Sequence, residues 1–171
     1  RNYIVPGVPE VTYAINDATS MKKHLITLFG FREENIIYIE DATVADFMRV
    51  FGKDENNYRG QLHDWVKDGE DVFIYYAGHG APSITNDDNS GSAYFVPVDA
   101  DPNYIMNTGY SLSTFYHNVD KIPAKSKTIV IDSCFSGNSS GGAVIRNVSS
   151  ALLKLKDEEV NLSSSSAVVM S

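Results

Sequence analysis

Two short motifs place a cysteine and a histidine, the residue pair of thiol-dependent hydrolysis, in similar local settings. Cys134 is the single cysteine of the 171 residues and follows the β-branched apolar run Thr128–Ile131. His79 follows a second apolar run, 71–76, and has a glycine on each side. Small residues after a strand let the backbone approach a substrate, and α/β proteins place their chemistry where parallel strands end. If the two strands are neighbours, the pattern predicts a thiolate nucleophile with an imidazole acid and base.

Each residue alone has a structural explanation. A lone cysteine is usually a small buried hydrophobe, and a lone histidine is usually a satisfied core or surface residue. Here both Cys134 and His79 follow an apolar strand, and both lie among glycine or serine residues. The matched settings favour a catalytic pair over two independent structural residues.

The two motifs resemble those of a known peptidase family. The segments 75–80 (YYAGHG) and 131–137 (IDSCFSG) resemble the histidine and cysteine boxes of the caspase-like cysteine peptidases, and more narrowly of the metacaspase and bacterial caspase-like branch. The resemblance covers nearly the whole chain. It implies a cysteine endopeptidase in which Cys134 is the nucleophile and His79 protonates the leaving amine. It also implies an oxyanion hole formed by the backbone N–H groups of Gly80 and Cys134.

The resemblance also implies which residues select the substrate. Asp132–Ser133 stand where true caspases have Gln-Ala, which argues against cleavage after aspartate. In the metacaspase branch, the aspartate two residues before the cysteine and that of an early Asn-Asp motif line the specificity pocket. Those positions are Asp132 and Asp17, and paired carboxylates favour arginine, then lysine. From the local sequence alone, Asp17 is as readily a helix cap, and Asp132 is as readily a buried acid bonded to neighbouring N–H groups.

Composition favours one enzyme domain over 1–171. The chain is 43% hydrophobic and 21% charged, which suits a real apolar core. A single cysteine excludes an internal disulfide framework, and the net charge of −8 argues against nucleic acid while suiting a basic peptide or protein substrate. No signal-peptide pattern and no apolar run of about 20 residues occurs, so we expect an intracellular protein without membrane contact.

Neither a metal nor a cofactor is expected. Several metacaspases are activated by calcium through aspartates, and this sequence has an acidic group near the histidine box, namely Asp87, Asp88, Asp99 and Asp101. Their spacing matches no EF-hand loop, so a solvated acidic loop is the preferred interpretation.

The elements that would position these residues alternate between strands and helices. Strands are expected at 35–39, 71–76, 93–98 and 128–131, with another beginning at Ala167. Helices are expected from the cap Asn16–Asp17 to Gly30, from 41–43 to Gly52, over 58–66, and after 111–113. Their buried stripes are predicted to be Ala18, Met21, Leu25 and Leu28, then Val44, Phe47, Met48 and Phe51, then Tyr58, Leu62, Trp65 and Val66. Residues 81–92 are predicted to form an exposed loop.

This alternation predicts an α/β fold with a mainly parallel sheet and helices on both faces. The resemblance specifies it as a caspase-like three-layer sandwich. It further implies that a first strand precedes Arg1 and that more of the domain follows Ser171, so that the rest of the protein's own chain, or a small subunit, completes the sheet.

The segment 137–166 is predicted to be an activation or processing loop. It joins the cysteine strand to the next one through glycines and a serine run, and it contains Arg146, Lys154 and Lys156. An enzyme that cleaves after basic residues would find candidate self-cleavage sites there. A surface linker with a short helix at 151–155 is an equal alternative.

Three other functions have to be weighed. The chain could be a catalytically silent caspase-fold regulatory or interaction module, but His79, Gly80, Cys134 and Gly137 are all present. A nucleotide-binding α/β domain is disfavoured because no G-x-G-x-x-G or G-K-[ST] motif occurs. Legumain-like and gingipain-like peptidases share histidine-glycine and cysteine boxes and remain a minor alternative.

Overall fold

The structure, a computed structural model, describes residues 2–84, 91–133, 138–139, 142–143 and 167–170. The helices are α1 (Ala14–Thr27), η1 (Glu33–Asn35), α2 (Val44–Phe51), α3 (Gln61–Trp65), η2 (Pro102–Tyr104), α4 (Ile105–Thr108) and α5 (Leu112–Asp120). The strands are β1 (Asp71–Ala77), β2 (Gly80–Ile84), β3 (Gly91–Phe95), β4 (Tyr110–Ser111), β5 (Ser126–Asp132), β6 (Asn138–Ser139), β7 (Gly142–Ala143) and β8 (Ala167–Met170). In the described ranges, no helix is both long and apolar enough to cross a membrane.

A parallel sheet contains both strands that lead to the predicted catalytic pair. Its strand order is β1-β5-β8, and β1 pairs with β5 from Asp71 opposite Ser126 to Ala77 opposite Asp132. Strand β8 continues the sheet in parallel on the other side of β5. The two strands are therefore neighbours with the same direction, as the sequence predicts, and both end at the same edge.

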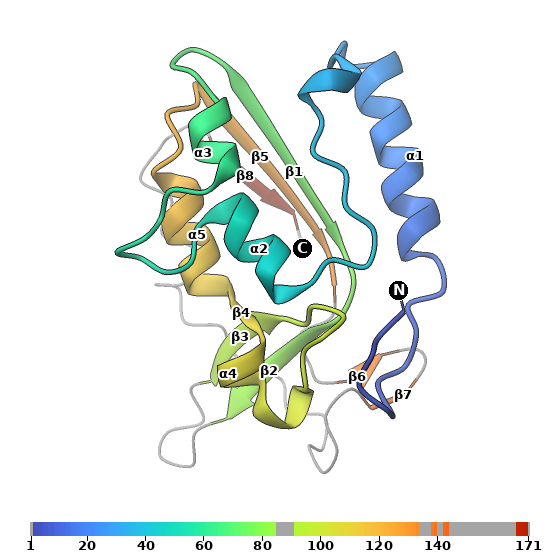
Figure 1. Ribbon diagram of the computed structural model, residues 1–171. Coiled ribbons are helices and arrows are strands. Elements are labelled where there is room, and N and C mark those ends of the chain that lie inside the picture. The colour runs from blue at the N-terminus through green and yellow to red at the C-terminus, as the bar shows by residue number, and fades with distance from the viewer. Residues whose placement is uncertain (1, 85–90, 134–137, 140–141, 144–166, 171) are drawn as a thin grey trace.

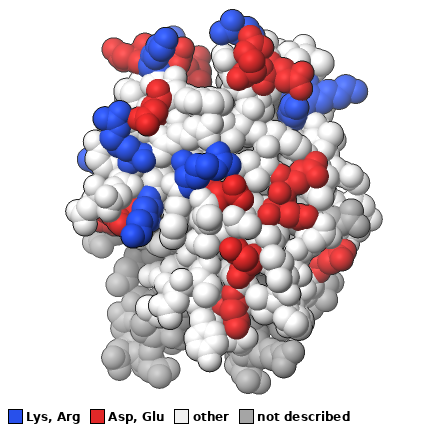
Figure 2. All heavy atoms as spheres, in the orientation of Figure 1, with Lys and Arg blue, Asp and Glu red and all other residues white. Residues whose placement is uncertain are grey.

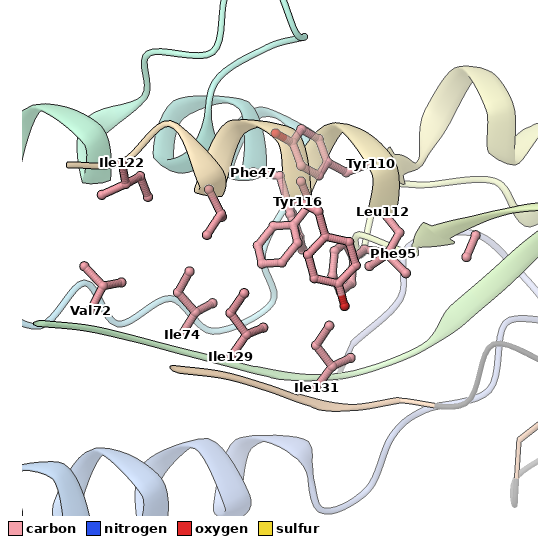
Figure 3. Close-up of a cluster of buried hydrophobic side chains, with 13 residues drawn as sticks. Phe47, Val72, Ile74, Phe95, Tyr110, Leu112, Tyr116, Ile122, Ile129 and Ile131 are labelled. Carbon is pink, nitrogen blue, oxygen red and sulfur yellow. The ribbon is translucent and has the colours of Figure 1, made fainter. Parts of the chain in front are cut away.

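Helices cover both faces of this sheet, which gives the predicted three layers. Helix α1 lies on one face, and α2, α3 and α5 lie on the other (Figure 1). The main core fills the second interface, where apolar side chains of β1 and β5 meet those of α2 and α5 (Figure 3). Its buried members are Phe47, Val72, Ile74, Ala93, Phe95, Tyr110, Leu112, Phe115, Tyr116, Val119, Ile122, Ile129 and Ile131.

A small antiparallel sheet, β2-β3-β4, continues from the end of β1 (Figure 1). The predicted loop at 81–92 is wrong for its first and last parts, because residues 80–84 form β2 and pair with β3, which begins at Gly91. Ala81 is fully buried and Ser83 is buried. The loop prediction followed the polar composition further along the chain, whereas Ala81 belongs to a small buried cluster with Val96, Ala100 and Ile105. The strand predicted at 93–98 forms with other bounds, because β3 runs from Gly91 to Phe95 and ends before Pro97, which cannot donate to a ladder.

Helix α1 begins earlier than predicted. Its N-cap is Tyr13, so Asn16–Asp17 lie inside the first turns and cap nothing. The helix ends at Thr27, and its C-cap Leu28 is 73% exposed instead of buried, although the Leu28 N–H still donates to the His24 carbonyl. Leu25 is buried as predicted, and Gly30 follows with a φ of +75°.

Helix α2 follows its prediction closely. Thr43 caps it through a capping box with Asp46, and Gly52 ends it with a φ of +97°, a conformation that favours glycine. Phe47 is buried, but Met48 is 37% exposed. Helix α3 is shorter than the predicted 58–66 segment, and its Trp65 is 48% exposed.

The predicted strand at 35–39 is not formed. Residues 33–35 make the short helix η1, and residues 36–39 belong to no strand. A strand needs a hydrogen-bonded neighbour, and here a groove of about 1020 Å³ lies between this segment and β1, lined on its two sides by residues such as Ile37 and Ile74.

Candidate active site

The predicted histidine lies where β1 ends beside β5. Ala77 is the register partner of Asp132, and the N–H of Gly78 donates to the Asp132 carbonyl at 3.3 Å. His79 comes two residues after Ala77, and Cys134 comes two residues after Asp132. Both therefore follow the same register pair of β1 and β5 at the same distance along the chain. Cys134 itself lies outside the described residues, as do Arg146, Lys154 and Lys156.

The imidazole of His79 is held by a backbone carbonyl. His79 is 4% exposed, and its Nε2 lies 2.7 Å from the carbonyl oxygen of Pro9. A carbonyl only accepts hydrogen bonds, so Nε2 carries the proton and the neutral ring keeps its lone pair on Nδ1. Burial lowers the pKa of His79, and the bond to Pro9 opposes this in part. The neutral ring is therefore ready to exchange a proton through Nδ1.

The backbone of His79 is held as firmly as its ring. Its N–H donates to the Tyr3 hydroxyl at 3.0 Å, and its carbonyl accepts from the Tyr76 hydroxyl at 2.8 Å and from the Val96 N–H at 3.0 Å. The Tyr3 ring also packs against the imidazole, with centroids 4.8 Å apart.

The segment that supplies Tyr3 and Pro9 is itself attached to the domain. Asn2 donates to the Asp41 carboxylate from its backbone N–H at 2.8 Å and from its side-chain amide at 2.6 Å. The N–H of Ile4 donates to the Val98 carbonyl at 2.8 Å. We refer to residues 2–9 as the N-terminal segment; its Tyr3 and Pro9 contact the histidine that follows β1.

Gly80 begins β2 directly after the histidine and is buried. Its register partner is Phe95, and the Val96 N–H donates to the carbonyl of the preceding residue, His79. In an antiparallel ladder, hydrogen-bonded and non-hydrogen-bonded pairs alternate, so Gly80 and Phe95 form a non-hydrogen-bonded pair. The N–H of Gly80 therefore points away from β3.

The two predicted specificity residues approach one phenol, Tyr75. Its hydroxyl donates a long hydrogen bond of 3.5 Å to Asp132 Oδ2. Burial raises the pKa of Tyr75 to about 12, and the negative charges of Asp132 and Asp17 add to the shift. Asp132 is exposed, so it is not the buried acid that its local sequence allowed, and Asp17, which is also exposed, is not a helix cap. Both carboxylates are thus free of the structural roles that competed with a pocket.

The remaining acidic residues near the histidine box have other tasks. Asp99 Oδ1 accepts from the Val44 N–H at 2.9 Å at the start of α2, and Asp101 caps η2. Asp87 and Asp88 lie outside the described residues. Within the part of the chain that the structure describes, no three histidine, cysteine or acidic side chains come close enough to share a metal ion.

Sequence reasoning missed four residues of the site: Tyr3, Pro9 and Tyr76, which contact the histidine, and Tyr75, which contacts Asp132. Strand alternation could have indicated the last two, since consecutive residues of β1 point to opposite faces. Pro9 acts through its backbone carbonyl, which no residue type reveals. Tyr3 lies in a loop 76 positions from its partner, and no local pattern marks such a contact.

Comparisons with known proteins agree with this geometry. A family model described as the metacaspase, peptidase C14 domain matches residues 2–140. Among curated proteins of Arabidopsis thaliana, the chain is 32% identical to Metacaspase-7 over 77% of its length, 34% identical to Metacaspase-6 over 75%, and 30% identical to Metacaspase-4 over 94%. The matched parts are 32%, 34% and 38% of those relatives, so the chain spans about a third of their length.

These matches cover most of the described chain, including both strands of the central pair and the N-terminal segment. They also extend across the cysteine box, whose residues 134–137 the structure leaves undescribed. The chain belongs to the metacaspase family, in its peptidase C14 domain.

Proposed function

We propose that this domain supplies the catalytic centre of a cysteine endopeptidase that cleaves after arginine and, less readily, after lysine. The observation that carries the proposal is the register of β1 and β5, in which Ala77 pairs with Asp132. That pairing brings the two chain segments that lead to His79 and to Cys134 out of the sheet at one edge. Membership of the metacaspase family supports the same assignment.

The chemistry needs a nucleophile, an acid and an oxyanion hole. The Cys134 thiolate attacks the substrate carbonyl carbon and forms a new S–C bond. The Nδ1 atom of His79 takes the proton of the Cys134 thiol and, as the imidazolium, gives it to the leaving amine as the C–N bond breaks. Nδ1 then takes a proton from the water that hydrolyses the thioester and returns it to the cysteine sulfur as the S–C bond breaks, while Nε2 keeps its own proton on the Pro9 carbonyl. The N–H of Gly80, directed away from β3, donates to the oxyanion together with the N–H of Cys134; such donors are typically worth about 3 kcal/mol each.

Arginine specificity is supported by the two carboxylates near Tyr75. Asp17 and Asp132 would bind a guanidinium in bidentate fashion, whereas an ammonium offers only a point charge. In Figure 2, the lower central part of the described surface shows acidic side chains and no basic ones, which favours a basic partner.

Self-processing and completion of the sheet belong to the same proposal. Cleavage after Arg146, Lys154 or Lys156 in the segment 137–166 would free that segment to form one wall of the cleft, and the rest of the protein's own chain or a small subunit would extend the sheet. Incubating the wild type beside Cys134→Ala and mapping fragments by mass spectrometry tests this. Cuts specific to the wild type after one of the three residues support processing, and a fully active, intact wild type contradicts it.

A positional-scanning fluorogenic peptide library, used with the full-length protein, tests activity and specificity together. We expect cleavage after arginine, then lysine, and no cleavage by Cys134→Ala. An arginyl chloromethylketone should label the wild type on Cys134. A preference for acidic residues would contradict the proposed specificity. Turnover by the alanine variant, or a label on another residue, would contradict the proposed mechanism.

A further inference from the structure

We propose that Tyr3 and Tyr76 are positioning residues, which fix the two peptide groups on either side of His79 and so orient its imidazole for catalysis. The inference rests on the proposed role of His79 as acid and base. Neither phenol reaches the reacting atoms through the contacts described; each acts on the backbone that carries the imidazole.

The two phenols bind complementary backbone groups of one residue. The Tyr3 hydroxyl accepts the His79 N–H at 3.0 Å, and the Tyr76 hydroxyl donates to the His79 carbonyl at 2.8 Å. The Tyr3 ring also packs on the imidazole at 4.8 Å between centroids. A backbone fixed at both its donor and its acceptor has little freedom to rotate, and the Tyr3 ring together with the Pro9 carbonyl limits the remaining side-chain torsions of the imidazole.

Tyr76 transmits the rigidity of the core to the histidine. Its ring packs edge-on against Phe95 at 4.6 Å and against Phe47 at 5.9 Å, and both phenylalanines are buried. The phenol therefore extends from the aromatic cluster of the core to a carbonyl three residues along the chain. This hydrogen bond ties the backbone of His79, which lies between β1 and β2, to a side chain that is packed in the core.

The residue between Tyr76 and His79 leaves room for this contact. A Cβ added at Gly78 would lie 2.5 Å from the Tyr76 hydroxyl oxygen and 2.8 Å from the ring carbon that bears it. A side chain at that position would displace the phenol from the His79 carbonyl. The glycine before the histidine is thus explained by the Tyr76 hydroxyl, independently of any substrate.

Both hydroxyls stay protonated throughout the pH range in which a protease works. Burial raises the pKa of Tyr3 to about 12 and that of Tyr76 well above its usual value. Tyr76 is therefore a permanent donor to the His79 carbonyl, and the contact does not titrate with the imidazole.

The test compares three conservative variants in the full-length protein: Tyr3→Phe, Tyr76→Phe and the matched control Tyr110→Phe. Tyr110 is also buried, its hydroxyl also donates to a backbone carbonyl at 2.8 Å, that of Gly52, and burial also raises its pKa to about 12. Each variant removes one phenolic oxygen and keeps the ring. Steady-state kinetics on the preferred library peptide gives kcat and KM, and urea unfolding gives stability.

We expect Tyr76→Phe and Tyr3→Phe each to lower kcat about tenfold with an unchanged KM, since losing one hydrogen bond typically weakens positioning by this order. Tyr110→Phe should lose as much stability as Tyr76→Phe yet keep its kcat. Unchanged kcat in both Tyr3→Phe and Tyr76→Phe, or an equal loss in Tyr110→Phe, would overturn the inference and leave these phenols with a merely structural role.

Two further measurements separate this inference from the proposed function. Full activity of His79→Ala would refute the dyad itself, whereas an inactive His79→Ala beside fully active tyrosine variants would refute only the positioning role. An NMR titration of His79 needs no substrate. Tyr3→Ala should admit water to the ring and raise the imidazole pKa toward its ordinary value, while Tyr110→Phe should leave it unchanged; equal titration in all three proteins would contradict the contact.

Discussion

Tyr75 and Tyr76 are consecutive residues of β1, and burial raises the pKa of both, yet their surroundings differ completely. Tyr76 points into the aromatic core between the sheet and α2, and its hydroxyl binds the His79 carbonyl. Tyr75 lies on the opposite face, where its half-buried hydroxyl meets the carboxylate of Asp132 and the charge of Asp17 on α1.

The difference shows how one strand serves two tasks. Strand alternation directs successive side chains to opposite faces. The face toward α2 and α5 offers tight apolar packing, which fixes geometry, and the face toward α1 offers carboxylates near solvent, which attract charge. Under the proposed function, catalysis and substrate selection belong to opposite faces of the sheet, so variants on one face should leave the other face nearly unchanged.

The largest effect should come from removing the packing behind Tyr76. Phe47 is buried and contacts Phe95, Tyr76 and Tyr110 at ring-centroid distances of 5.3 to 5.9 Å. Phe47→Ala should lower the free energy of unfolding by about 3–5 kcal/mol, as large-to-small substitutions in cores do. Urea unfolding measures this, with Met48→Ala on the exposed side of the same helix as a control that should change little. A loss below about 1 kcal/mol for Phe47→Ala would show that this side is not the rigid one.

Removing a carboxylate on the Tyr75 side should alter selection and spare stability. Asp132→Ala should lower kcat/KM for arginyl peptides by about 2–3 kcal/mol, the lower part of the range for one partner of a buried charge pair, because Asp132 is exposed before substrate binds. The unfolding midpoint should stay constant. Asp68→Ala, an exposed acid in the turn before β1, is the matched control. Equal losses for arginyl and uncharged peptides would refute a role in specificity.

Tyr75→Phe sharpens the same contrast with a smaller effect. It removes the hydroxyl that donates to Asp132 and keeps the ring. We expect kcat/KM for arginyl peptides to fall by about 0.5–1 kcal/mol through KM, because a weak hydrogen bond that orients the carboxylate is lost. The opposite split, a fall in kcat at constant KM, is expected of Tyr76→Phe. Identical kinetic patterns for the two variants would remove the distinction between the faces.

The smallest effect should be a pH dependence of stability that arises from His79. Burial holds its folded-state pKa below the ordinary value of about 6.5. As the pH falls below that value, the unfolded chain takes up the proton first, so the folded state loses stability until its own pKa is passed. Urea unfolding at about pH 7.5 and about pH 5 should therefore show a smaller acid-induced loss in His79→Gln than in the wild type. Equal losses would mean that the imidazole is not held neutral.

The sequence predicted the sheet pair and the second helix because their signals are local. The apolar runs before His79 and Cys134 are long enough to identify β1 and β5, and Thr43 with Gly52 marks both ends of α2. The predictions fail for segments whose secondary structure depends on a partner far away in the sequence. The apolar segment 36–39 has strand composition but no paired neighbour, and Ala81 is in a polar neighbourhood but pairs with Tyr94.

The candidate site divides in the same way. Residue types and the family resemblance indicated His79, Gly80, Asp17 and Asp132, because each has a side chain or a motif position that can be read. Pro9 contributes a carbonyl oxygen that every residue possesses, so its contact with the imidazole follows from the fold alone. The role of Pro9 therefore depends on where the fold places its carbonyl and not on its residue type.

The N-terminal segment gives the site a dependence on folding order. Its contacts with His79 close sequence separations of 70 and 76 positions, whereas the Tyr76 contact spans three. Long closures are entropically costly and form late, and such peripheral attachments are also the first to open in native proteins. A molecule in which this segment has detached would keep its β1–β5 pairing while its imidazole lost both the Pro9 carbonyl and the Tyr3 ring. Loss of enzymatic activity would then measure the detachment of the N-terminal segment, and circular dichroism would measure the unfolding of the sheet. The two transitions could be followed separately.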